Sequence, residues 1–351
     1  MTDDPNAIDE ATLAPYLADH VADFGELQSV SKFNTGQSNP TYLVEATSGK
    51  YVLRAKPPGE LLKSAHQVDR EFRVMNGLAG TGVPVPRMLH LCEDAETSPI
   101  GRMFFIMSHL DGRILWDPAL PEFGEGEAAN AERSAIYDAM NETLAALHAV
   151  DPSAVGLADF GKPGNYFERQ TTRWAKQYRA SELDRIEDVH TTIQWLEDNM
   201  PADDGQVSIV HGDYRLDNMI FHKNEPRVIA VLDWELSTLG HPLADLAYQC
   251  MQWRLPHQGG MRGLGGMDRA AIGIPTEKEY VASYCARRGV SEIPNWPFYI
   301  VFCMFRLTAI LQGVYRRAVE GNASNPGRAK EMAAAIPLLA RAGIDLIEKE
   351  T

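Results

Sequence analysis

The sequence is poor in cysteine, and we expect it to contain no signal peptide, membrane span or disulfide framework. Its four cysteines, Cys92, Cys250, Cys285 and Cys303, are too scattered for a zinc site or a dense disulfide framework. The first ten residues are acidic, unlike the basic-then-apolar order of a signal peptide. No apolar run approaches the roughly eighteen residues of a membrane span. These absences predict a cytoplasmic protein with no membrane partner.

Basic residues are also missing from one end of the chain. Residues 1–30 carry seven acidic and no basic side chains, whereas residues 251–330 carry eleven Lys or Arg against five Asp or Glu. The net charge of −15 at pH 7 and the lack of a DNA- or RNA-binding motif argue against a nucleic-acid partner. A positive C-terminal region favours an anionic small molecule. Scattered surface arginines that bind nothing are the alternative.

The most informative segment is His-Gly-Asp-Tyr-Arg-Leu-Asp-Asn at residues 211–218, with Asp233 fifteen residues further on. Short apolar stretches at residues 207–210, 219–221 and 227–232 predict strands, so both motifs lie at strand ends. A single Asp in such a place is more often a turn or cap residue. The pairing of the two motifs favours a chemical role.

Phosphoryl transfer needs these residue types at this spacing. The protein mainly positions the reactants and holds Mg²⁺, which neutralises charge on the phosphates. In the kinase pattern an Asp orients the attacking hydroxyl, an Asn five residues later binds one metal ion, and an Asp on a following strand binds metal between the phosphates. Asp213, Asn218 and Asp233 fill these three places, and their oxygens are ligands that Mg²⁺ prefers.

Other residues of the motif are candidates for the same chemistry. A guanidinium at Arg215 can stabilise charge on the transferring phosphate, although a surface arginine is the alternative. His211, at the head of the motif, is grouped with the catalytic residues. Asp217 is expected to brace the loop.

The phosphates of a nucleotide have candidate ligands near the N-terminus. A β-hairpin is expected over residues 33–55, and its first loop contains Gly36, Gln37, Ser38 and Asn39. Backbone N–H groups of such a loop can face anionic oxygens, and a glycine permits close approach. A plain hairpin turn would use a glycine equally well.

Arg54 stands in the following strand, where kinases place a phosphate-binding lysine. Its guanidinium can clamp two phosphates and also pair with a carboxylate. Lys56 on the same strand face is the competitor, but the register of Arg54 with the apolar residues favours Arg54. Its expected partner is Glu71, which lies beside the apolar stripe of a helix predicted over residues 66–78.

A continuous apolar strand is expected over residues 103–108, in the place of a kinase hinge. Adenine would then be recognised by the carbonyl of Ser108 and the amide of Leu110, with Met107 as the neighbouring gatekeeper. An ordinary buried strand would have the same sequence.

The acceptor side is the least defined part of the sequence. A helix over residues 298–317 mixes aromatic side chains with Arg306, Arg316 and Arg317. Trp174 and Tyr178, one helical turn apart, line either the cleft or the core.

Together these motifs resemble the aminoglycoside phosphotransferase-like, or choline-kinase-like, superfamily. Further segments are similar to the kinase domain that precedes an acyl-CoA dehydrogenase in some eukaryotic fusions. They are residues 36–42, 56–59, 70–72, 82–86, 240–247 and 312–315. No dehydrogenase follows them here, so a stand-alone version is expected.

The resemblance implies an α+β, bilobal, protein-kinase-like fold. Residues 1–108 would form an N-terminal nucleotide-binding lobe with an antiparallel sheet and an acidic helical extension at residues 1–25. Residues 109–351 would form a larger, mainly helical lobe for catalysis and acceptor binding. Asp245 resembles the buried Asp that accepts backbone N–H groups of the catalytic loop, and His148 is expected in the core.

The same resemblance implies an ATP- and Mg²⁺-dependent phosphotransferase that acts on a hydroxyl of a small molecule. The dehydrogenase-fused relatives imply a hydroxyacyl-CoA acceptor, with aminoglycoside, sugar or choline-like kinases as alternatives. A catalytically silent nucleotide-binding scaffold is a second alternative. Retention of Asp213, Asn218 and Asp233 argues against silence.

Overall fold

The computed structural model describes residues 6–33, 39–59, 66–258, 261–321 and 326–350. The chain divides into two compact units. The first unit is Met1–Arg113 with Ile229–Ser237, and the second unit is Ile114–Val228 with Thr238–Thr351. The sequence places the boundary after residue 108 and assigns residues 229–237 to the C-terminal lobe, whereas in this division they belong to the first unit. Each unit is described by itself below.

The first unit is built on a five-stranded sheet in which all neighbouring strands are antiparallel, in the order β1-β2-β3-β5-β4. The strands are β1 (Leu27–Lys32), β2 (Thr41–Ala46), β3 (Gly49–Ala55), β4 (Met88–Cys92) and β5 (Phe104–Ser108). The turn between β2 and β3 uses Gly49 at φ 141°, where a side chain would be strained. The expected hairpin and the apolar strand before the hinge are both present.

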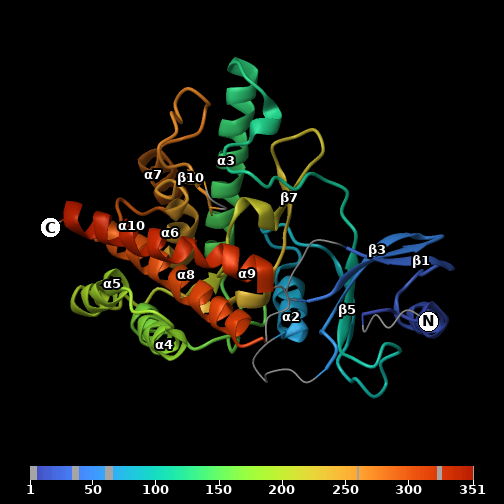
Figure 1. The fold of residues 1–351 in the computed structure, drawn as a ribbon. Helices are drawn as coiled ribbons and strands as arrows, with labels where there is room; N and C mark the ends of the chain where they lie inside the picture. The colour runs from blue at the N-terminus through green and yellow to red at the C-terminus, as the bar shows by residue number, and fades with distance from the viewer. Residues whose placement is uncertain (1–5, 34–38, 60–65, 259–260, 322–325, 351) are drawn as a thin grey trace. The chain divides into compact units, whose positions relative to one another are not determined.

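Two helices cover the two faces of this sheet (Figure 1). Helix α1 (Glu10–His20) buries Leu13 and Leu17 against one face, in a cluster that includes Leu53. Successive side chains of a strand point to opposite faces, so Arg54 points to the other face. Helix α2 (Val68–Leu78) packs there, with the ring of Phe72 against Phe105. The period of the strand therefore places Arg54 toward α2.

Glu71 lies within the buried stripe of α2. The buried residues recur at helical spacing, and they are Val68, Glu71, Val74, Met75 and Leu78. A carboxylate in such a stripe must find a partner, because an unpaired buried charge is costly. The sequence therefore requires a cation on the facing sheet.

The second unit is mainly helical. Its helices are α3 (Glu127–Ala149), α4 (Tyr166–Ser181), α5 (Glu187–Asp198), α6 (Leu243–Met251), α7 (Glu277–Arg288), α8 (Trp296–Val319), α9 (Pro326–Ala333) and α10 (Ala335–Glu350). Strand β6 (Ser208–Val210) ends directly before the motif at residues 211–218, and it pairs antiparallel with β9 (Thr238–Gly240). The predicted α+β organisation, with a sheet-based N-terminal part and a helical C-terminal part, is confirmed.

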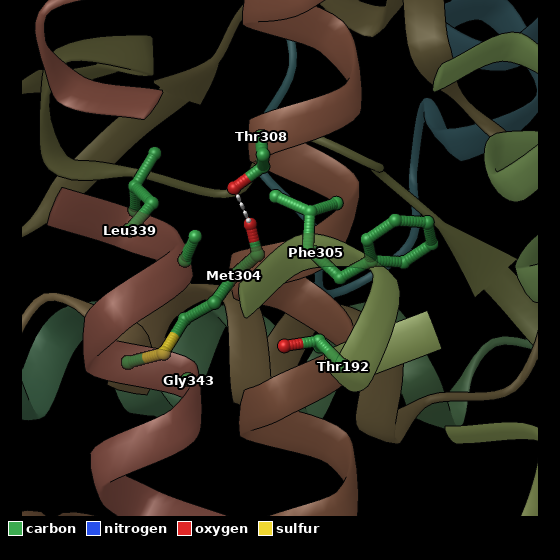
Figure 2. Close-up of a pocket in the computed structure, with 8 residues that line it drawn as sticks. Thr192, Met304, Phe305, Thr308, Leu339 and Gly343 are labelled. Carbon is green, nitrogen blue, oxygen red and sulfur yellow. Dashed lines mark hydrogen bonds between the residues drawn. The ribbon is translucent and has the colours of Figure 1, made fainter. Parts of the chain in front are cut away.

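Helix α8 is the centre of the second unit, and it corrects one sequence expectation. It is long and apolar enough to cross a membrane by length and composition alone. However, its most apolar stretch is 78% buried inside the protein, which is typical of a core helix. Figure 2 shows α8 residues Met304, Phe305 and Thr308 beside Leu339 and Thr192 from neighbouring helices. The gap between these side chains has no room for water.

Candidate active site

The loop of residues 211–218, which carries the candidate catalytic residues and is called the catalytic loop below, is held by a buried carboxylate in the second unit. Asp245, in the first turn of α6, is completely buried. Its Oδ2 accepts the His211 N–H at 2.6 Å and its Oδ1 accepts the Gly212 N–H at 2.8 Å. Burial opposes ionisation, but donors around the carboxylate outweigh it and hold the pKa of Asp245 below its ordinary value. The expected role of Asp245 is confirmed.

His148 supports the same carboxylate from α3. Its Nε2 lies 3.4 Å from Asp245 Oδ2, and its Nδ1 lies 2.7 Å from the Tyr284 hydroxyl. Burial lowers the pKa of His148, which favours the neutral ring. His148 is therefore a hydrogen-bonded core residue, as the sequence predicts.

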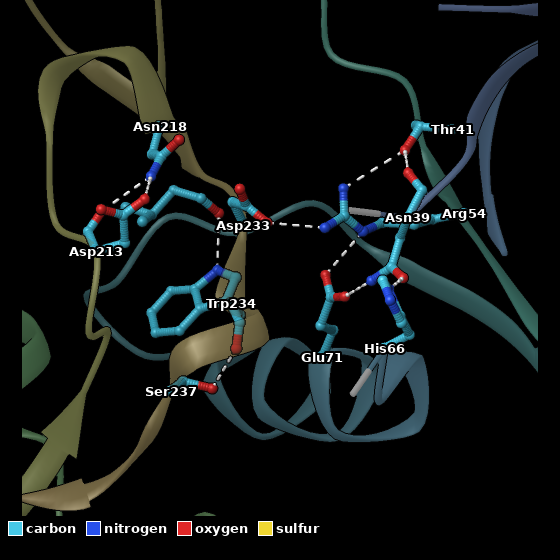
Figure 3. A network of polar contacts seen from close by, with 11 residues as sticks. Asn39, Thr41, Arg54, His66, Glu71, Asp213, Asn218, Asp233, Trp234 and Ser237 are labelled. Atoms are coloured by element: carbon cyan, nitrogen blue, oxygen red, sulfur yellow. Dashed lines mark hydrogen bonds and ion pairs between the residues drawn. The ribbon is translucent and has the colours of Figure 1, made fainter. Parts of the chain in front are cut away.

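Asp213 is held by Asn218, which the short 3-10 helix η2 (Leu216–Asn218) brings back over the loop. The Asn218 amide nitrogen donates to the Asp213 carbonyl at 2.8 Å and to Asp213 Oδ2 at 2.9 Å (Figure 3). Burial favours protonated Asp213, but Arg215, Tyr248, His211 and Asn218 together hold the pKa of Asp213 below its ordinary value. Asp213 is therefore an ionised acceptor at neutral pH.

The bonds to Asp213 also orient Asn218. They use the amide nitrogen, and the amide oxygen points away from Asp213 (Figure 3). A metal ion would need that oxygen, since an amide binds Mg²⁺ through its oxygen. The orientation of Asn218 fits the predicted metal-binding role.

Arg215 lies between two carboxylates of the same loop. Its NH2 group pairs with Asp217 Oδ2 at 2.7 Å, and its Nε lies 3.6 Å from Asp213 Oδ1. Burial raises the pKa of Asp217, and Arg215 opposes that rise. Asp217 thus braces the loop through Arg215, as expected. The catalytic role of Arg215 stays a prediction.

His211 requires a correction. The sequence groups it with the catalytic residues, but its ring is completely buried. Its Nδ1 accepts the backbone N–H of Asp213 at 3.2 Å. The geometry therefore gives His211 a positioning role within the loop, because a ring without exposed surface has no access to a substrate.

In the first unit, Arg54 is the centre of a charged network (Figure 3). Its Nε pairs with Glu71 Oε2 at 2.8 Å, and its NH2 pairs with Asp233 Oδ1 at 2.7 Å. Its NH1 also donates to the Thr41 hydroxyl at 3.4 Å. The predicted pairing of Arg54 with Glu71 is confirmed. Within the described residues, Glu71 pairs with Arg54 and not with Lys56.

Glu71 and Asn39 continue the network. Glu71 is 1% exposed, and burial raises its pKa to about 7 while Arg54 opposes the rise. The Asn39 amide nitrogen donates to Glu71 Oε1 at 2.7 Å, and its oxygen lies 2.9 Å from His66 Nδ1. Asn39 is predicted to cover phosphates, but its side chain is buried and bonded to Glu71. The other predicted loop residues, Gly36, Gln37 and Ser38, lie outside the described residues.

Asp233 occupies an unusual backbone conformation at the start of a 3-10 helix, η3 (Trp234–Leu236). Its φ of 63° is left-handed, which a residue other than glycine adopts at some cost. Trp234, completely buried, fixes the turn by donating from Nε1 to the Val231 carbonyl at 2.9 Å. The Asp233 side chain stays 37% exposed. It therefore remains accessible to a metal ion despite its bond to Arg54.

The described residues contain no cluster of three or more His, Cys, Asp or Glu side chains that could hold a metal ion. A kinase-type site does not require such a cluster. Mg²⁺ in these enzymes takes one or two protein oxygens and completes its octahedral shell with phosphate and water oxygens. The donor chemistry of Asn218 and of Asp233 fits that use.

The predicted hinge residues lie at the end of β5. Met107 is buried in the sheet, where it pairs in register with Val52. The Ser108 N–H donates to the Arg87 carbonyl at 2.9 Å, and Leu110 follows the strand. Adenine recognition by Ser108 and Leu110 stays a prediction.

A groove of about 700 Å³ in the second unit contains none of the predicted site residues. It runs along α7, and its polar rim is partly paired internally. Arg254 bonds to Glu277 at 2.8 Å, and the Trp296 indole N–H donates to the same carboxylate at 2.7 Å. The chemistry of the catalytic loop, rather than this groove, therefore defines the candidate site.

Comparison with known families agrees with this geometry. Residues 29–280 match the phosphotransferase enzyme family. This match spans most of the chain, so the protein belongs to the phosphotransferase enzyme family.

Particular relatives refine the assignment. The chain is 48% identical over 295 residues to acyl-CoA dehydrogenase family member 10 of Mus musculus, a match that covers 84% of this chain and 27% of that protein. It is similar to a crystal structure of a candidate aminoglycoside phosphotransferase from Ralstonia eutropha, with 47% identity, a TM-score of 0.87 and coverage of 98% and 99% of the two chains. The chain thus spans about a quarter of the mouse relative and nearly all of the bacterial one.

A more distant structure shows the fold alone. An aminoglycoside phosphotransferase in complex with AMP-PNP and hygromycin B is 18% identical, with a TM-score of 0.58 and coverage of 95% and 98% of the two chains. The predicted kinase-like fold and the resemblance to the kinase domain of acyl-CoA dehydrogenase relatives are confirmed.

Proposed function

We propose that this protein transfers the γ-phosphoryl group of ATP to a hydroxyl of a small anionic molecule, with Mg²⁺ as cofactor. The observation that carries the proposal is the Asp213 carboxylate, which Asn218 and Arg215 hold in place and keep ionised. An ionised carboxylate can accept the hydroxyl proton, or orient it, as the oxygen attacks.

The other residues take roles that follow from their chemistry. Arg54 offers a guanidinium for the nucleotide phosphates, and Glu71 holds that guanidinium in place. Asn218 and Asp233 would hold Mg²⁺, which neutralises charge on the phosphates when bound. Arg215 offers positive charge next to Asp213, where charge develops on the transferring group. A distant structural neighbour that binds AMP-PNP supports ATP as the donor.

A hydroxyacyl-CoA is the acceptor class that we propose to test first. The relatives named acyl-CoA dehydrogenase support it, and so does the positive charge of residues 251–330. Three arginines of that region are neutralised by ion pairs, namely Arg254 with Glu277, Arg287 with Asp138 and Arg316 with Glu320. Two of these carboxylates, Glu277 and Glu320, are already included in the charge count of the region, and only Asp138 lies outside it. The paired arginines are less free to bind a ligand, so a buried arginine becomes the more informative cation.

The test is release of ADP by purified protein with Mg²⁺ and ATP, in the presence of 3- and 4-hydroxyacyl-CoAs. We expect at least one of them to stimulate turnover. Asp213→Asn and Asp233→Asn should each reduce turnover roughly a hundredfold or more. Asp184→Asn, a change at an exposed aspartate of the second unit, is the matched control and should leave turnover unchanged.

Other outcomes would redirect the proposal. Stimulation by an aminoglycoside, a sugar or an amino alcohol, and not by a hydroxyacyl-CoA, would assign a different acceptor class. ATP binding without turnover on any acceptor would favour a nucleotide-binding scaffold. Equal turnover in the parent and in the Asp213 variant would show that the assigned catalytic residue is wrong.

A further inference from the structure

Arg306 of α8 is a buried cation without a direct ion-pair partner among the described residues. It is 5% exposed, and within the described residues its guanidinium takes part in no hydrogen bond or ion pair. An arginine stays protonated in proteins, so this charge is present at all ordinary pH values. Burial of an unpaired charge is costly. The site therefore favours a ligand that brings negative charge.

Two aromatic rings hold the guanidinium. Its Cζ lies 5.8 Å from the centre of the Trp174 ring on α4 and 5.6 Å from the centre of the Tyr248 ring on α6. Both distances are within the range of cation–π attraction. Such contacts orient an arginine but leave its five N–H donors available. The two rings therefore hold the guanidinium in one orientation but do not neutralise its charge.

Trp174 adds an independent sign of a missing partner. Its indole N–H is buried and has no hydrogen-bond partner within the described part of the chain. Buried donors are nearly always paired, so an orphan donor points to a missing acceptor. A second guanidinium, that of the exposed Arg173, lies 5.2 Å from the centre of the same ring. Donors and positive charge thus gather around Trp174.

Tyr248 connects this cluster to the catalytic loop. Its ring lies against Arg306, and its hydroxyl acts on the Asp213 carboxylate. Asp213 also acts electrostatically on Arg306. Tyr248 therefore contacts both the Arg306 guanidinium and the proposed catalytic carboxylate of Asp213. All of these residues belong to the second unit.

We propose that Arg306 and the Trp174 indole N–H form a subsite for an anionic oxygen group, a carboxylate or a phosphate, of the molecule whose hydroxyl faces Asp213. This subsite deepens the proposed function and rests on it for the identity of the ligand as an acceptor. Arginine suits the task because its planar fork binds carboxylate and phosphate oxygens through two parallel bonds. The subsite would select hydroxylated anions over neutral or cationic alcohols.

The test is isothermal titration calorimetry with three probes and no nucleotide. The probes are 3-hydroxybutyrate, which carries a carboxylate, 3-hydroxybutyryl-CoA, which carries phosphates, and 1,3-butanediol, which carries no charge. We expect the parent protein to bind at least one anionic probe more tightly than the diol. Arg306→Met should weaken that anion roughly tenfold or more, as expected for loss of charge-assisted hydrogen bonds, and should leave the diol unchanged.

Companion variants keep the test decisive if Arg306→Met does not fold. Arg306→Lys keeps the charge but loses the planar guanidinium, so we expect a smaller loss of anion affinity than in Arg306→Met. Trp174→Phe keeps a ring but removes the N–H donor, and it should weaken the same anion a few-fold. Arg317→Met, at an exposed arginine of the same helix, is the control and should change nothing. Melting temperatures and circular dichroism report whether each variant folds.

The probes also separate the two sources of the anion. A loss confined to the free hydroxy acid assigns the subsite to a carboxylate, and a loss confined to the CoA thioester assigns it to a phosphate. Equal weakening of the diol and the anions would overturn the proposal, because a merely structural arginine would have that effect. A parent protein that binds neither anion more tightly than the diol would overturn it as well.

Turnover with ATP distinguishes this inference from the proposed function. Suppose that Arg306→Met loses anion binding and that the parent protein consumes no ATP with any probe. The subsite proposal would then stand, and the phosphotransfer proposal would be wrong. Turnover of an anionic probe with the same KM in Arg306→Met and in the parent would remove the subsite and leave phosphotransfer in place.

Discussion

The catalytic loop of the second unit and the Arg54 network of the first unit are held by different physical means. In the loop, the completely buried Asp245 accepts two backbone N–H groups, so the main chain itself is fixed. In the network, Arg54 is held by the side chains of Glu71 and Asp233. A main-chain anchor fixes a conformation, whereas a chain of ionisable side chains can respond to pH or to a ligand.

The carboxylates of the two regions illustrate this difference. The pKa of Asp245 is held below its ordinary value, so its charge is constant around neutral pH. Burial raises the pKa of Glu71 to about 7, so its charge changes within the physiological range. We therefore expect the conformation of the loop to be insensitive to pH around neutrality. We expect the Arg54 network to change with pH or when a ligand binds.

The largest effect is expected from removal of the loop anchor. Asp245→Ala leaves two buried N–H groups without an acceptor and His148 without its partner. Each buried donor left without an acceptor costs about 1–3 kcal/mol, so we expect a loss of about 3–5 kcal/mol of unfolding free energy. Urea unfolding would measure the loss, with the exposed Asp184→Ala as control. A loss below about 1 kcal/mol would mean that the loop is not anchored through Asp245, and the comparison would fail.

Removal of the central cation should have a smaller effect, on ATP use rather than on folding. Arg54→Ala removes the group assigned to the nucleotide phosphates and leaves two carboxylates facing each other. We expect kcat/KM for ATP to fall about a hundredfold, which is roughly 2.7 kcal/mol of transition-state stabilisation. Lys56→Ala is the matched control, since Lys56, directly after β3, is the competing cation. A larger fall in Lys56→Ala would transfer the phosphate contact to that lysine.

Much of this arrangement could be predicted from local sequence patterns. The period of the strand and the period of the helix place Arg54 and Glu71 face to face, and the structure confirms their pairing. Strand ends likewise predict that Asp213 and Asn218 lie on one loop. These contacts follow from short-range periodicity, which a sequence contains directly.

Other roles could not be read from the sequence, because they depend on distant contacts. The amide of Asn39 bonds to Glu71, thirty-two positions away, so a residue in a glycine-containing loop becomes a support for the helix carboxylate. The burial of His211 depends on how α3 and α6 pack around its loop. In the sequence Arg306 is one of several cations of a helix, and only the packing of α4 and α6 shows that it is buried without a direct ion-pair partner among the described residues.

The raised pKa of Glu71 predicts a pH dependence with a definite sign. Between pH about 4.5 and about 7 the folded protein holds a proton on Glu71 that the unfolded chain releases, so this residue's contribution to stability falls as pH rises. Glu71→Gln cannot titrate. The unfolding free energy of the parent relative to Glu71→Gln should therefore decrease, on the order of 2 kcal/mol, from pH 5 to pH 8.

Urea unfolding at the two pH values measures this difference, and Glu93→Gln, at an exposed glutamate of the first unit, is the control. A difference that stays constant with pH would show that Glu71 remains ionised throughout. The network would then be as rigid as the loop, and the contrast between the two regions would disappear.

The smallest effect is expected within the loop itself, at Arg215. Burial works against the charge of Asp213, and Arg215 is the main group that lowers the pKa of this carboxyl. In Arg215→Ala the pKa of Asp213 should rise, so the acidic limb of the profile of kcat/KM against pH should move to higher pH. The loss of positive charge beside the transferring group should also reduce kcat about tenfold.

Arg215→Lys keeps the charge, so its acidic limb should lie between those of the parent and Arg215→Ala. Arg227→Ala, at an exposed arginine of the same unit, should leave the profile unchanged. The profile would stay in place in Arg215→Ala if Asn218 and Tyr248 alone kept Asp213 ionised. In that case neutral hydrogen-bond donors both hold the loop and keep Asp213 ionised. The difference from the network around Arg54, which is held by ion pairs, would then be larger.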